Sequence, residues 1–216
     1  MTAIRPIDRP ALVRRSQWLN YTTIGYNSLE GILSVAAGAL AGSVALVGFG
    51  IDSLIELAAG FAALWRLRAD ASAAGRERVE RATLRLIGAC FIALAIYVGV
   101  DAVRGLVTMA APAESGFGIA IAAASLLVMP LLARAKRSVA LQLGSGALAA
   151  EAKQTMICTY LSAILLGGLA LNATLGWWWA DPAAALAMVP FIGWEGLEGL
   201  RGRSVCDDCA PSVGVA

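Results

Sequence analysis

The chain has 216 residues, of which 59% are hydrophobic and 15% are charged, and its mean hydropathy is +0.73. This composition excludes an ordinary soluble globular domain and predicts an integral membrane protein. The formal net charge is only +2, and the basic residues are not gathered into a patch that could follow a phosphate backbone. We therefore expect no nucleic-acid partner.

Six apolar segments of about 20 residues, the length that crosses the hydrocarbon of a bilayer, follow one another along the chain. Gly42 leaves room for only a tight turn between the first two, and three tryptophans at 177–179 predict an interfacial anchor before the last. We expect an all-α integral membrane protein with a segment 1–17, a six-helix transmembrane domain 18–202 and a short tail 203–216. The six transmembrane helices are predicted at Trp18 to Ala41, Ser43 to Trp65, Thr83 to Val107, Gly116 to Ala133, Ala147 to Leu171 and Asp181 to Leu200.

The basic residues lie almost entirely on one side of this arrangement. Fifteen of the 17 precede the first helix, separate the second from the third, follow the fourth or follow the sixth, and the two exceptions are Arg104 and Lys153. Positively charged flanks stay on the cytoplasmic side of a membrane. The pattern therefore predicts that both termini are cytoplasmic and that the protein spans the cytoplasmic (inner) membrane.

Asp52 and Glu56 lie four residues apart inside the second predicted helix. This spacing places both carboxyl groups on one face of the helix, about 6 Å apart along its axis. Each ionisable residue at the centre of a bilayer costs roughly 2.5 to 3.5 kcal/mol, so the pair needs a compensating partner. A cation is the natural partner, and because neighbouring carboxylates repel each other, a divalent metal and a proton would compete for the same place.

Glu30 brings a third acid to the same depth. It lies 12 residues before Gly42, and Asp52 lies ten residues after it, so an antiparallel hairpin sets the two side by side. Tyr26 and Asn27 add neutral polar atoms nearby, for which hydrogen bonding between helices is the simplest role. We expect the acids to meet near the middle of the membrane.

Polar residues also recur on one face of the fifth predicted helix, at spacings of three, four and four. Carboxylates together with a thiolate suit zinc, cobalt or cadmium, whereas an all-oxygen set favours magnesium or manganese, so the metal stays open. Histidine is absent, and any proton coupling must therefore run through the acids. No nucleophile paired with a base and no phosphate loop is present, so we expect neither an enzyme nor a resident cofactor. The face consists of Glu151, Gln154, Cys158 and Ser162.

Three stretches resemble the signatures of the cation diffusion facilitator family, and the similarity runs from about residue 18 to residue 202. They are Gly42-Ser43-Val44-Ala45-Leu46 followed by Asp52-Ser53-Leu54-Ile55-Glu56, then Gly144-Ser145 through Gln154 and Cys158, and finally Asp181-Pro182.

The resemblance implies a homodimeric transporter that exports divalent metals such as zinc, with protons flowing inward. It also implies a metal site made of two residues four apart on the second helix and two on the fifth. Asp52 and Glu56 match the first pair, while Gln154 and Cys158 stand where the family usually has histidine and aspartate. The chain looks like a divergent member without the family's histidine-containing loop and cytoplasmic C-terminal domain. The predicted metal-binding residues are thus Asp52, Glu56, Gln154 and Cys158, with Glu30 as an extra ligand or proton carrier, and zinc is the favoured ion.

Two other functions fit the same residues. The buried acids could neutralise an organic cation that stacks on aromatic side chains during export, or the protein could be a membrane module that binds metal without transporting it. In the tail, Cys206-Asp207-Asp208-Cys209 is compatible with metal capture, with a redox pair or with an exposed polar end.

Overall fold

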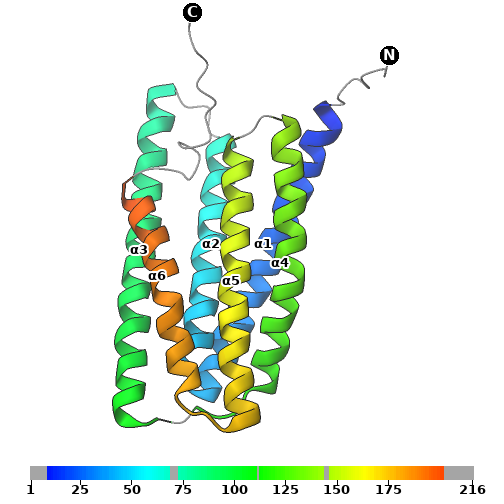
Figure 1. The fold of residues 1–216 in the computed structure, drawn as a ribbon. Helices are drawn as coiled ribbons and strands as arrows, with labels where there is room; N and C mark the ends of the chain where they lie inside the picture. Colours follow the sequence, from blue (N-terminus) through cyan, green and yellow to red (C-terminus); the bar gives the residue numbers. More distant parts are fainter. Residues whose placement is uncertain (1–8, 69–72, 111, 144–145, 202–216) are drawn as a thin grey trace, which may run out of the picture.

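The computed structural model describes residues 9–68, 73–110, 112–143 and 146–201, and these residues form six helices without a strand (Figure 1). Each helix corresponds to one predicted span, which confirms the all-α, six-helix membrane fold. The helices are α1 (Arg9–Ala41), α2 (Val44–Arg68), α3 (Ala73–Thr108), α4 (Gly116–Leu143), α5 (Gly146–Leu175) and α6 (Ala180–Leu200).

Three helices extend nine or ten residues beyond one end of the apolar segments that predicted them. α1 begins nine residues before Trp18, α3 begins ten residues before Thr83, and α4 ends ten residues after Ala133. A helix satisfies its own backbone hydrogen bonds, so it can continue past the hydrocarbon into a polar flank. Hydropathy therefore marked the apolar part of each helix but not its end.

Among the described residues, three segments combine the length and composition of a membrane span. They are Leu84–Thr108 in α3, the whole of α4, and Glu151–Leu175 in α5, with mean hydropathies of 2.3, 2.2 and 1.7. The assignment of the termini to the cytoplasm and the division at residues 17 and 202 stay predictions. The Cys206 to Cys209 motif lies outside the described residues.

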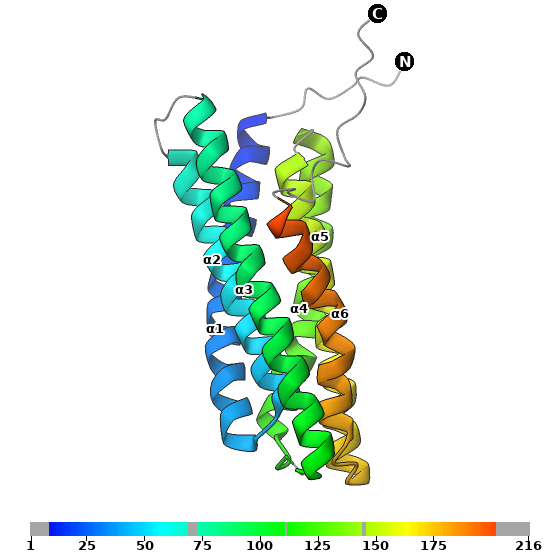
Figure 2. The ribbon, with the colours of Figure 1, turned by 90° about the vertical axis from the view of Figure 1, so that its left-hand side faces the viewer.

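The helices run alternately up and down (Figures 1 and 2). The start of α1 and the end of α6 lie at one end of the bundle, together with the end of α2, the start of α3, the end of α4 and the start of α5. The described segments that carry most of the basic residues therefore share one end of the molecule.

α2 occupies the centre of the bundle, where it packs against α1, α3, α5 and α6. Small residues bring some backbones into direct contact: a Cβ atom added to Gly50 would lie 2.7 Å from the backbone nitrogen of Val35, and one added to Gly88 would lie 2.5 Å from that of Leu200. Glycine is the residue that permits such close approach of membrane helices. The acids of α2 are thus enclosed by neighbouring helices.

A carboxylate from α6 caps the N-terminus of α2. Gly42 adopts a left-handed conformation (φ 68°) in the tight turn after α1, as predicted. The buried Asp181 then accepts hydrogen bonds from the hydroxyl of Ser43 and from the backbone N–H of Val44, the latter at 3.0 Å. The free N–H groups at a helix start favour a negative charge, so this contact fixes α6 against α2.

Candidate metal site

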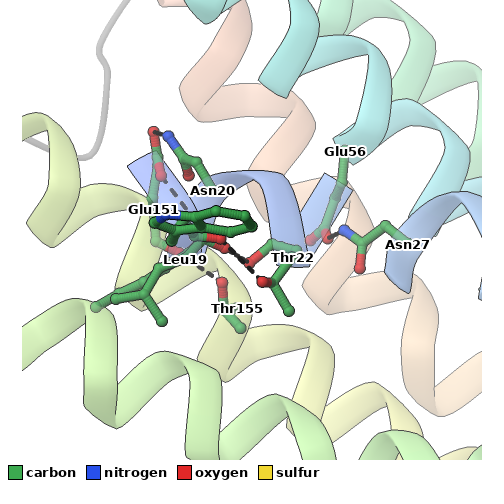
Figure 3. A network of polar contacts seen from close by, with 10 residues as sticks. Leu19, Asn20, Thr22, Asn27, Glu56, Glu151 and Thr155 are labelled. Atoms are coloured by element: carbon green, nitrogen blue, oxygen red, sulfur yellow. Dashed lines mark hydrogen bonds and ion pairs between the residues drawn. The ribbon is translucent and has the colours of Figure 1, made fainter. Parts of the chain in front are cut away.

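The two acids of α2 are enclosed but incompletely hydrogen-bonded. Asp52 is fully buried (0% exposed), and neither of its carboxylate oxygens has a hydrogen-bond partner among the described residues. Glu56 is half-buried; its Oε2 accepts a hydrogen bond of 3.0 Å from the Asn27 amide (Figure 3), while its Oε1 has no partner. Unpartnered buried carboxylate oxygens are costly in a protein interior, so these two acids favour a bound cation or a proton.

Glu30 approaches the same region from α1, as the hairpin geometry predicted. It is 3% exposed, its Oε2 accepts a hydrogen bond of 3.1 Å from the Ser53 hydroxyl, and the hydroxyls of Ser125 and Tyr26 also interact with its carboxyl group. Its carboxylate interacts electrostatically with Asp52 and with Glu56. The three predicted acids therefore lie close enough to interact electrostatically with one another.

The fifth helix presents Cys158 to these acids. The cysteine is fully buried and interacts electrostatically with Glu56, Glu30 and Asp52. The hydroxyl of Ser162 lies 2.7 Å from the Cys158 carbonyl oxygen and 2.8 Å from the Ser125 hydroxyl, so it links α5 to α4. Ser162 thus has the hydrogen-bonding role between helices that its neutral side chain suggested.

Gln154 lies one turn nearer the start of α5 and is half-buried, and its amide makes no hydrogen bond with the acids in the described structure. In the described part of the chain, no three Asp, Glu, Cys or His side chains are close enough together to hold a metal ion. The acids and Cys158 thus lie in one region without forming a coordination shell, and no contact in the described structure joins Gln154 to them. The ligand set stays a prediction.

The remaining member of the α5 stripe has a different partner. Glu151 Oε2 lies 3.6 Å from the Lys136 ammonium, and its Oε1 accepts a hydrogen bond of 3.4 Å from the Asn20 amide (Figure 3). The sequence places Lys136 in the basic flank after the fourth span, but α4 continues past it and its side chain is buried. The contacts of Glu151 with Lys136 and Asn20 therefore connect α5 to α4 and α1 beside the acid region.

The sequence analysis did not identify Glu195, an acid on α6. Its carboxylate is partly buried, its Oε2 has no partner among the described residues, and it interacts electrostatically with Asp52 and Glu56. A signal was present, because Asp181, Met188 and Glu195 are spaced by seven residues along one helical stripe. The region therefore contains four carboxylates and one thiol; Lys136, whose ion-pair partner is Glu151, interacts electrostatically with Glu56.

Two comparisons with known proteins agree with this architecture. The family model of the cation efflux transmembrane domain matches residues 23–201. An uncharacterised transporter of Synechocystis sp. (strain ATCC 27184 / PCC 6803 / Kazusa) is 29% identical over 175 residues, which cover 78% of this chain and 56% of that protein. The chain thus spans little more than half the length of this relative. Since the family model covers most of the chain and includes every predicted ligand, the chain belongs to the cation efflux family of membrane transporters.

Proposed function

We propose that the protein transports a divalent metal cation across the cytoplasmic membrane, exporting zinc or a similar ion such as cobalt or cadmium. The single observation that carries the proposal is Asp52, a fully buried aspartate whose two carboxylate oxygens have no partner among the described residues. A carboxylate in that position is stabilised by a cation that binds and leaves. The family membership supports cation transport as the general activity.

The proposed ligands are Asp52, Glu56, Gln154 and Cys158, and Glu30 serves as an additional ligand or as a proton carrier. The choice of zinc, cobalt or cadmium is supported by the position of Cys158, because sulfur ligands favour borderline and soft ions over magnesium or manganese. Helix movements complete the coordination shell, since the described side chains do not form one.

Transport is proposed to run as an exchange of metal for protons. A carboxyl group that carries a proton loses the charge and the lone pair that bind a metal, so the two cations exclude each other at the acids. Protonation from the outer side releases the metal, and deprotonation on the inner side restores the site. The proposed working unit is a homodimer, and the cycle needs neither covalent catalysis nor a resident cofactor.

The test is uptake of divalent ions into proteoliposomes, measured for zinc, cobalt, cadmium, manganese and magnesium with and without a pH gradient. We expect zinc flux that rises with the gradient and falls to the level of empty liposomes in Asp52→Asn. Glu198→Gln on α6, whose carboxylate pairs with Arg201 at 3.4 Å, is the matched control and should retain wild-type flux.

Two results would reject the proposal. Flux of an organic cation such as ethidium without metal binding would identify an organic-cation exporter. Zinc binding without flux for any of the ions would identify a non-transporting metal-binding module.

A further inference from the structure

Asp181 fixes the depth of α6 relative to α2. Its carboxylate accepts the 3.0 Å hydrogen bond from Val44, so the two helices begin at one level and run in the same direction (Figures 1 and 2). Glu56 lies 12 residues after Val44 and Glu195 lies 14 residues after Asp181. At the usual helical rise these intervals are about 18 Å and about 21 Å, so the two carboxyl groups reach nearly the same depth.

The same interval fixes the direction in which Glu195 projects. Fourteen residues are nearly four full turns, so its side chain leaves the helix within about 40° of the direction of Asp181. Met188 and Ile192 lie on the stripe between them and are fully buried, so the stripe continues past Pro190. α6 therefore directs Glu195 toward α2.

Acidic side chains of α2 and α6 therefore face each other. Glu195 interacts electrostatically with Asp52 and Glu56, and its Oε2 is buried without a partner among the described residues. Asp52 is fully buried with both oxygens unpartnered. Buried acids with free lone pairs repel one another unless they take up protons or a cation binds between them, and Lys136, which interacts electrostatically with Glu56, is itself paired with Glu151.

We propose that Glu195 is a cation ligand, which α6 contributes to the site formed by Asp52, Glu56 and Cys158. This inference deepens the proposed function and rests on it. A carboxylate from α6 supplies negative charge, which the neutral amide of Gln154 on α5 does not.

The experiment compares Glu195→Gln with Glu198→Gln in the purified full chain. Glu198 lies three residues further along α6 and pairs with Arg201 at 3.4 Å, so it is an acid of the same helix outside the site. Zinc affinity is measured by calorimetry, and thermal stability is measured without metal. We expect Glu195→Gln to weaken zinc binding at least about tenfold, since a direct ligand matters at least as much as an outer-shell partner.

Without metal, Glu195→Gln should leave the melting temperature unchanged or raise it, because it removes repulsion among buried acids, and Glu198→Gln should change neither quantity. Glu195→Asp keeps the charge and should bind zinc more tightly than Glu195→Gln. Wild-type affinity in Glu195→Gln, alongside lost affinity in Asp52→Asn, would refute the inference while leaving the transport function intact. A lowered melting temperature together with equally weak binding in Glu195→Asp would assign a structural role instead, and absence of zinc binding by the wild type would refute both proposals.

Discussion

The carboxylate of Asp181 accepts a hydrogen bond from the backbone N–H of Val44, 137 residues away in the sequence, and so closes the N-terminus of α2 with an acid from α6. The Ser43 hydroxyl donates to the other oxygen of the same carboxylate and accepts the N–H of Leu46 at 3.1 Å. This arrangement satisfies the first N–H groups of the central helix without water, which matters at a buried helix start.

Asp181→Ala should therefore destabilise the bundle. Loss of a buried helix cap and of a charge-assisted hydrogen bond costs about 1 to 3 kcal/mol, so we expect a lower melting temperature of the purified protein. Asp181→Asn, which retains one acceptor oxygen, should lie between the wild type and Asp181→Ala. An unchanged melting temperature in Asp181→Ala would contradict the proposed role of the contact.

Cys158→Ser should change which metal is preferred. The substitution replaces a soft sulfur atom with a smaller, harder oxygen atom, so affinity for cadmium and zinc should fall while affinity for manganese changes little. The matched control is Cys90→Ser, since Cys90 is an exposed free cysteine on α3. Competition titrations with the three ions give the ratio of their dissociation constants. Equal losses of affinity for all three ions would exclude sulfur as a ligand.

Zinc affinity should fall as the pH falls. The metal and protons compete for the same carboxylate oxygens, so zinc binding releases protons and acid opposes it. Calorimetry at about pH 6 and about pH 8, repeated in buffers of different ionisation enthalpy, measures both the affinity and the number of protons released. Identical dissociation constants at the two pH values, with no proton release, would exclude proton exchange at the acids.

The buried ion pair between Lys136 and Glu151 offers a test of packing beside the site. Glu151→Gln removes the ion-pair partner of the buried lysine, which then keeps only its electrostatic interaction with Glu56 among the described acids; such a loss costs about 3 to 5 kcal/mol in fully enclosed pairs. The Glu151 side chain is 32% exposed, so solvent screening reduces the loss, and we expect about 1 to 3 kcal/mol. Lys136→Met combined with Glu151→Leu should recover most of the melting temperature, and Glu198→Gln in the exposed pair should change it little. A double variant no more stable than Glu151→Gln would show that the ion pair is not the source of the loss.

The helices and the pair of acids on α2 could be predicted from the sequence because both are local properties. A run of apolar residues of sufficient length determines a membrane helix, and a spacing of four residues determines that Asp52 and Glu56 share a face. The Gly42 turn was also predictable, and its hairpin placed Glu30 at the depth of Asp52. Helix ends were less predictable, since hydropathy gives no signal where a helix continues into a polar flank.

Tertiary structure decided which helix faces meet. The sequence identified Glu151 as part of a polar stripe on α5, and packing of the helices paired that residue with Lys136. Glu195 was not identified from the sequence as a site residue, and the packing of α6 against α2 brought its side chain into electrostatic interaction with Asp52 and Glu56. Helical periodicity defines a face within one helix, whereas the partner of that face depends on contacts between residues far apart in the chain, and those contacts are fixed only when all six helices pack together.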